Sequence, residues 1–194
     1  MIQLSKNKQF LLALIIPVII LLGMTVKPLL TTFFGETIYL QTVPFDPRDL
    51  FYGDYVDLQF EIERLPVTLL DKELQSKLES NGHSFKDYKD TSVYIVLELN
   101  QQSGIHEAVI ITEKKPSSSP YIKGIMSPYL SYSDWDDQNS QKVVYIDIPV
   151  ERYFLEENTG KQLEQDAREG RLIAEIKVKD GYPILQEVLK DARN

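Results

Sequence analysis

The strongest constraint on this chain is an uncharged apolar run from Phe10 to Val26, close to the amino terminus. As an α-helix the run rises roughly 25 Å, near the lower limit for crossing the hydrocarbon core of a bilayer. Lys27 follows it and can extend to the interface, and the apolar residues between 29 and 34 continue beyond it. The run therefore predicts a membrane-spanning helix.

The alternative is a secretory signal peptide that is cleaved. The apolar run is long for such a peptide, and its only small-x-small sequence, Gly23-Met24-Thr25, is a poor cleavage site. The chain has no cysteine, which excludes a lipoprotein anchor, disulfides and thiol chemistry. We therefore expect the segment to be retained as a signal-anchor.

The charges around the apolar run predict its orientation. Lys6, Lys8 and the amino terminus outweigh Lys27, so the short amino-terminal end should stay in the cytoplasm. The expected organisation is a cytoplasmic end over residues 1–8, a transmembrane and juxtamembrane segment over 9–34, and one extracytoplasmic domain over 35–194.

The charge balance limits the partners of that domain. The chain has 21 Lys and Arg against 29 Asp and Glu, a net charge of −8, and every acidic residue follows Gly35. An acidic domain is a poor ligand for nucleic acid. Adsorption on anionic lipid is also disfavoured, because the one basic pair in this part of the sequence is Lys114-Lys115.

Two turns and an alternating segment follow the anchor. Asp46-Pro47 fits the first two positions of a type I turn, and Gly53-Asp54 forms a second turn. From Asp54 to Ile62 apolar and polar residues alternate, which is the period of a half-buried strand. The apolar face would carry Val56, Leu58, Phe60 and Ile62.

Alternation elsewhere predicts a mostly β fold of the α+β kind, with about eight antiparallel strands and one or two short helices. The strands at 93–99 and 105–112 form a hairpin, and 121–126 would return as the third strand of a meander. The other strands are predicted at 37–43, 54–62, 143–148, 171–178 and 182–189. Leu70 to Ser80 is a short amphipathic helix, and 160–169 is an exposed helical turn or a loop.

Two segments resemble the GDYXXLXY domain family. Gly53, Asp54, Tyr55, Leu58 and Phe60 occupy the positions of its name, with Phe60 in place of the last Tyr. A core-facing Phe keeps the packing of Tyr and loses only its hydroxyl. The second segment resembles a Tyr-Phe-x-x-Glu-Gly-x-Gly motif, in which Asn158 replaces a Gly and tolerates the same positive φ. Its matching residues are Tyr153, Phe154, Glu157, Asn158 and Gly160.

The resemblance covers the chain after about residue 36, and its implications concern location more than chemistry. It implies a membrane-anchored bacterial protein that accompanies, or is joined to, a multi-pass membrane protein, in a family without an established activity.

Catalytic and metal sites find little support. Ser5, Ser127 and the run Ser117 to Ser119 lack the context of a serine-lysine peptidase nucleophile. The acids of 133–139 resemble a calcium loop, but Asn139 stands where that loop requires Gly. His83 and His106 have no partner at ligand spacing, and each is expected at the surface. No catalytic residue, cofactor or metal is predicted.

One cluster remains as a candidate site. Asp46, Arg48, Asp49 and Asp54 surround the two turns beside the aromatic residues Phe45, Phe51, Tyr52 and Tyr55. These acids can cap the turns and pair with Arg48, which is a structural role. Alternatively, the exposed members bind a partner.

The leading hypothesis is an extracytoplasmic accessory or interaction domain that works with a multi-pass envelope membrane protein. The alternative is an envelope hydrolase, a peptidase or a carbohydrate-active protein, that uses carboxylate or Ser/Lys chemistry.

Overall fold

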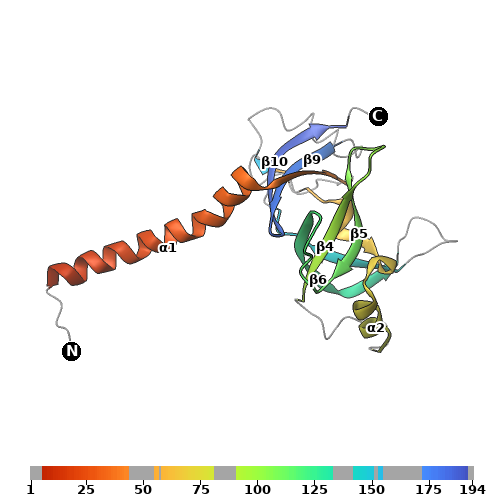
Figure 1. The fold of residues 1–194 in the computed structure, drawn as a ribbon, viewed down its shortest axis with the longest axis horizontal. Coiled ribbons are helices and arrows are strands. Elements are labelled where there is room, and N and C mark those ends of the chain that lie inside the picture. Colours follow the sequence, from red (N-terminus) through yellow and green to blue (C-terminus); the bar gives the residue numbers. More distant parts are fainter. Residues whose placement is uncertain are drawn as a thin grey trace.

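A long helix, α1 (Lys6–Phe34), opens the chain and extends away from a β domain (Figure 1). In this computed structural model the described residues are 6–43, 55–56, 58–80, 91–132, 142–150, 153–154 and 172–191. Apolar side chains along the helix are exposed, and the stretch Ala13–Phe34 is long and apolar enough to cross a membrane. The predicted transmembrane helix is therefore present as a candidate span.

The described strands form three antiparallel sheets. The first is β1 (Glu36–Gln41), β9 (Leu172–Lys179) and β10 (Tyr182–Lys190), with β9 in the centre. The second pairs β2 (Tyr55–Val56) with β8 (Tyr153–Phe154). The third has the order β3 (Arg64–Pro66), β7 (Lys142–Asp147), β6 (Tyr121–Tyr132), β4 (Ser92–Leu99) and β5 (His106–Thr112). The mostly β class with few helices is confirmed.

The hairpin of β4 and β5 forms as predicted, but the meander does not. β6 pairs with β4 on the side opposite β5, from Ser92↔Ile125 to Val96↔Tyr121. The outer edge of β5 has other partners, because the Ile111 carbonyl accepts the N–H of Asp71 at 2.9 Å. Near its other end, His106 accepts the N–H of Tyr39. The returning strand therefore pairs with the free edge of β4.

The predicted strand over 54–62 is interrupted. The β2 ladder covers Tyr55–Val56, Phe60 forms an isolated bridge with Thr42, and Glu61–Glu63 is a 3-10 turn. The carboxylate of Glu63 accepts the Phe60 N–H at 2.8 Å, and the Glu63 N–H donates to the Phe60 carbonyl at 3.0 Å. These local hydrogen bonds take the place of ladder pairing at this point of the chain. The apolar alternation still holds, because Phe60 and Ile62 are buried and Leu58 is half-buried.

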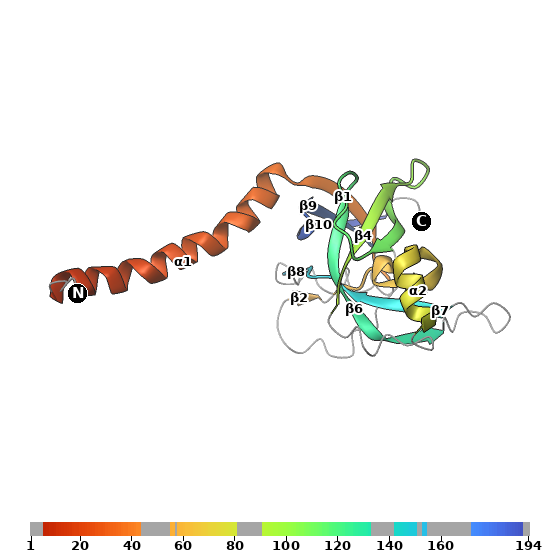
Figure 2. The same cartoon turned by 60° about the horizontal axis from the view of Figure 1, so that its bottom comes forward.

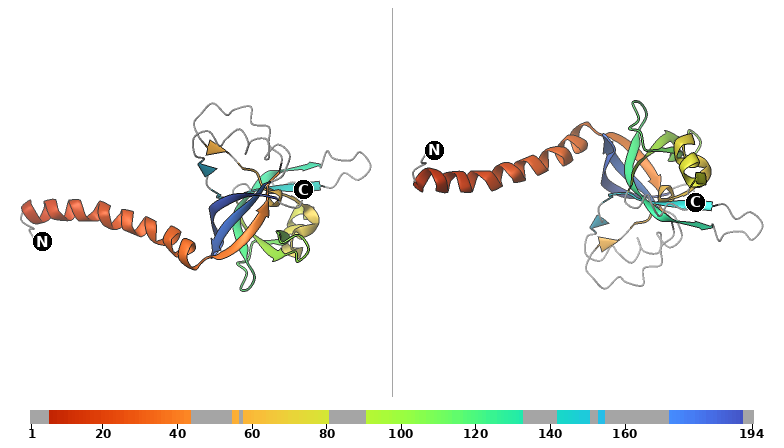
Figure 3. Two further views of the ribbon diagram at one scale, coloured as in Figure 1. Left: turned by 90° about the horizontal axis from the view of Figure 1, so that it is seen from above. Right: turned by 90° about the horizontal axis from the view of Figure 1, so that it is seen from below.

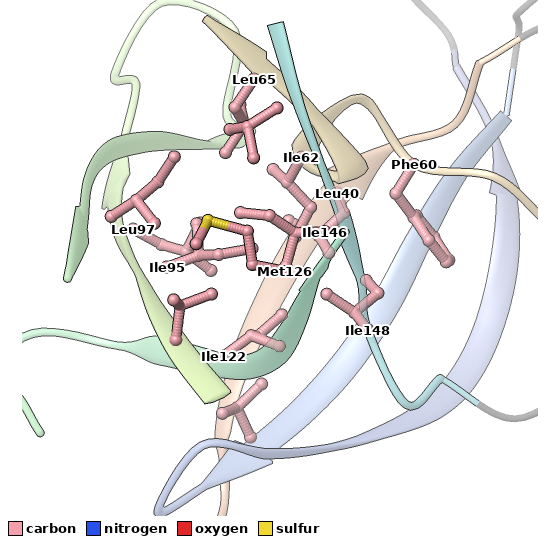
Figure 4. Close-up of a cluster of buried hydrophobic side chains, with 14 of the residues drawn as sticks. Leu40, Phe60, Ile62, Leu65, Ile95, Leu97, Ile122, Met126, Ile146 and Ile148 are labelled. Atoms are coloured by element: carbon pink, nitrogen blue, oxygen red, sulfur yellow. The ribbon is translucent and has the colours of Figure 1, made fainter. Parts of the chain in front are cut away.

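The core lies between the curved five-stranded sheet and the three-stranded sheet (Figure 4). β4 and β9 each bury alternate side chains, as the sequence period requires. The largest buried side chains come from both sheets, so the strands that are distant in sequence share one core. These fully buried residues include Leu40, Ile95, Leu97, Ile122, Met126, Ile146 and Ile176.

The predicted amphipathic helix is α2 (Lys72–Ser80), which follows a 3-10 turn at Val67–Leu69. The Asp71 carboxylate accepts the Leu74 N–H at 2.8 Å and caps the first turn of the helix. Leu74 and Leu78 are buried in the core. In Figures 2 and 3, α2 lies on the side of the domain away from α1, whereas β9 and β10 lie on the α1 side.

Candidate functional site

The two sequence motifs meet in the β2–β8 ladder. Tyr55 pairs with Phe154 and Val56 pairs with Tyr153, in an antiparallel register. Nothing in the spacing of the motifs indicates this pairing, because a two-residue ladder has no period to recognise. The ladder lies on the side of the domain from which α1 leaves (Figure 2).

The remaining motif positions divide into two groups. Phe60 has 2% of its surface exposed, so the prediction that it faces the core is confirmed. Leu58 is half-buried and packs against the core. Outside the described residues lie Asp46, Arg48, Asp49, Gly53, Asp54, Glu157, Asn158 and Gly160, together with the helical turn or loop expected at 160–169. Their roles stay predictions.

The structure has an open groove of about 1130 Å³, which is lined in part by the end of the first motif and the residues that follow it. Its lining consists of residues 58–65, the beginning of β5 with the preceding Ile105, and the end of β7, together with Gln41, Val43 and Ser127. Four of the lining side chains are acidic, one is an arginine and one is a histidine. These are Glu61, Glu63, Glu107 and Asp147, with Arg64 and His106.

Glu63 is an acid of the groove whose environment shifts its pKa. Burial raises the pKa of its carboxyl above the ordinary value, and the nearby Asp147 acts in the same direction. The backbone hydrogen bonds with Phe60 and Ile148 oppose this shift. The carboxylate therefore has a local structural role, and its proton affinity is raised.

His106 is buried, with 8% of its surface exposed, which corrects the prediction that it is a surface residue. Its Nδ1 accepts the Tyr39 N–H at 3.2 Å, so the ring joins β5 to β1. Burial lowers the pKa of the imidazole, while Glu36 acts in the opposite direction. A residue that accepts through Nδ1 carries its proton on Nε2 when it is neutral. Alternation within β5 did not reveal this link, because it depends on a strand of another sheet.

The groove offers polar recognition more than an assembled catalytic set. The Arg64 guanidinium lies 5.7 Å from the centroid of the Tyr145 ring, which fixes one wall. Carboxylates on the other walls suit ligands that carry amines or several hydrogen-bond donors. Within the described ranges, no three His, Asp or Glu side chains gather as metal ligands. Ser5, His83 and the calcium-like segment 133–139 lie outside those ranges.

Comparison with known proteins agrees with the two motifs. The sequence model of the GDYXXLXY protein family matches residues 17–188. The match begins within α1 and ends within β10, so it includes both motifs and the groove between them. No curated protein and no solved structure matches the chain. The resemblance drawn from the motifs is confirmed.

Proposed function

The chain belongs to the GDYXXLXY protein family, and from this premise we propose that it is a single-pass membrane protein with an extracytoplasmic accessory domain. The domain would act by binding a multi-pass membrane protein of the same envelope. The observation that carries the proposal is α1, an apolar helix that runs directly into the first strand of the domain.

The surface of α1 supports a membrane location. The stretch Ala13–Phe34 has 22 residues and a mean hydropathy of 2.3, and its side chains are largely exposed, apart from Thr31 near its end. An exposed apolar surface of this length is costly in water and is stabilised by lipid. The charges at Lys6 and Lys8 support a cytoplasmic amino terminus, with the domain on the other side.

The position of the motif ladder supports a partner in the same membrane. β2 and β8 lie on the α1 side of the domain, where a neighbouring membrane protein is within reach (Figure 2). The acidic groove lies next to this ladder in sequence and complements basic or donor-rich segments. The first motif also carries the charged and aromatic residues that the sequence singled out for binding.

Three measurements on cells test the proposal. The full chain should stay with membranes through carbonate washing, and protease added to spheroplasts should digest the domain. In mild detergent it should co-purify with a multi-pass membrane protein in fixed stoichiometry. Release of a soluble fragment that begins near Val26 would instead identify a cleaved signal peptide. Protection from external protease would reverse the orientation.

A hydrolase of the envelope is the second candidate, and one observation favours it. Glu63 has a raised pKa and lies near Asp147 in an open groove, as a general acid beside a second carboxylate would. Against this role, the Glu63 carboxylate already accepts the N–H of Phe60. Loss of hydrolysis of a defined envelope substrate in both Glu63→Gln and Asp147→Asn would favour the hydrolase. Unchanged partner capture in these variants would separate the two functions.

A further inference from the structure

The end of α1 packs against the hairpin between β9 and β10. The Nζ atom of Lys27 lies 4.4 Å from the centroid of the Tyr182 ring. Thr31 is buried, and the N–H of Gly35 donates to the Thr31 carbonyl at 2.8 Å. A side chain on Gly35 would place its Cβ only 2.3 Å from that oxygen. The close turn holds the domain against the end of the helix.

Four lysines from different elements surround the turn of this hairpin, and we name them the lysine cluster: Lys27, Lys115, Lys123 and Lys179. Lys115 forms an ion pair with Asp180 at 3.0 Å. The N–H of Lys123 donates to the Gly181 carbonyl at 2.9 Å, which places this strand beside the turn. The turn itself follows Lys179 and has positive φ at Asp180 and Gly181.

The side chains of the cluster reach solvent. Lys27, Lys115 and Lys123 are exposed, and Lys179 is half-buried. Lys123 lies against the turn through its stem, because a Cβ on Gly181 would lie 3.3 Å from that of Lys123. Lysine stems of this kind pack along a surface while the ammonium groups extend into water or towards head groups.

The acids near the cluster do not neutralise it. Asp180 lies within the cluster, and Lys115, then Lys179 and Lys27, hold the pKa of its carboxyl below the ordinary value. Glu36 lies on the neighbouring strand, opposite Val178. Among the described residues, the cluster thus brings four lysines together beside Asp180 and Glu36, on a chain whose net charge is −8. Along the sequence these lysines are scattered, and for that reason lipid adsorption was not expected. The fold brings them together.

We propose that the lysine cluster binds the phosphate groups of anionic phospholipids in the membrane that α1 crosses. This inference rests on the proposed membrane anchor. The cluster surrounds the hairpin turn that packs against the end of the helix, so the bilayer surface is the anionic partner nearest to it. Figure 3 shows β9 and β10 beside the end of α1. Attraction at the cluster and repulsion of the acidic remainder fix the side of the domain that faces the lipid.

Lipid preference can be measured on the full chain in liposomes. The chain has no cysteine, so Ser118→Cys gives a single labelling position on the exposed turn that follows Lys115. A fluorophore there is quenched by lipids that carry a nitroxide near the top of one acyl chain. The nitroxide is placed either on phosphatidylglycerol or on phosphatidylcholine, in mixtures of identical composition. The quenching efficiency with labelled phosphatidylglycerol, divided by that with labelled phosphatidylcholine, reports the local preference for anionic lipid.

The inference requires a ratio above one at Ser118→Cys that falls as salt is added. A label at Glu79→Cys, in the last turn of α2 on the distant side, should show no such ratio. Lys123→Gln with Lys179→Gln should lower the preference about fivefold for each lysine removed. The matched control, Lys72→Gln with Lys142→Gln, removes the same charge far from the helix and should leave the ratio unchanged.

Asp180→Asn provides a test of opposite sign. Asn tolerates the φ of 51° at this position, and the substitution removes the acid from the cluster. The preference for phosphatidylglycerol should increase. Melting temperatures of all variants must match that of the parent for the comparison to hold, and each substituted side chain is polar and surface-exposed or half-buried.

The outcomes separate this inference from the anchor. If the protein fails to float with liposomes, the anchor and the lipid site both fall. If it floats but the two quenching efficiencies are equal, only the lipid site falls. A preference that both double variants reduce equally would show a general charge effect and would also overturn the inference.

Discussion

At the scale of single residues, the burial of Glu63 in the 3-10 turn raises the pKa of its carboxyl, and this couples the stability of the domain to pH. Its native pKa is raised above the ordinary 4.5, so the native state binds more protons than the unfolded chain between these two values. The stability contributed by the protonated carboxyl is fully present below about pH 4.5 and is lost as the pH rises through the native pKa. Above that pKa the carboxylate is a charge in a partly desolvated position.

Glu63→Gln should accordingly raise the melting temperature at pH 7 to 8 and give no advantage at pH 4. The neutral amide keeps the size of the side chain and can still accept the N–H of Phe60. Thermal unfolding across this pH range measures the effect, with Glu107→Gln as a control at an exposed position of the same groove. Destabilisation at pH 7 to 8 would mean that the charged hydrogen bond outweighs the cost of burial, and equal destabilisation at both pH values would show that the effect does not depend on ionisation.

Among the secondary-structure elements, α2 offers a direct test of packing. Leu74 is fully buried beneath the helix. Leu74→Ala removes three carbons from this position and should lower the free energy of unfolding by about 2–4 kcal/mol. Glu79→Ala, on the exposed side of the same helix, should change it little. Urea unfolding of the two variants measures the difference, and equal small effects would mean that α2 contributes little to the core.

The elements also show what the sequence could predict. Periodic signals predicted the anchor helix, α2 and the long strands, because alternation and helical spacing are local properties of the chain. The order of β6, β4 and β5 could not be predicted, because it depends on which edge is already occupied by Asp71 and Tyr39. The turn at Glu61–Glu63 was missed, since a side-chain carboxylate replaces the expected ladder partner.

The candidate site was predicted less completely than the fold. The motif residues drew attention to the segment that leads into the groove, and the burial of Phe60 followed from alternation. His106 and the lysine cluster were missed, because each depends on contacts between elements that are far apart in sequence. Charge patterns read along a chain do not report groups that a sheet brings together.

At the scale of the whole molecule, the central question is whether the first motif folds the domain or binds a partner. Gly53 and Asp54 are the two residues before β2, and both belong to the turn predicted from the sequence. A Gly with positive φ would explain the absence of a side chain, and Asp54 would accept backbone amides. The ladder of Tyr55 with Phe154 adds a reason for order here, because a turn at Gly53-Asp54 would position one motif against the other.

This reasoning separates two pairs of substitutions. Gly53→Val should unfold or misassemble the domain, and Asp54→Ala should cost about 1–3 kcal/mol through amides left unpaired. Arg48→Ala and Tyr55→Ala should leave the melting temperature nearly unchanged and weaken capture of the membrane partner. Co-purification from membranes, normalised to the amount of folded protein, measures the second effect. If all four variants lose stability together and none specifically impairs capture, the motif is a folding device and partner binding lies elsewhere on the domain.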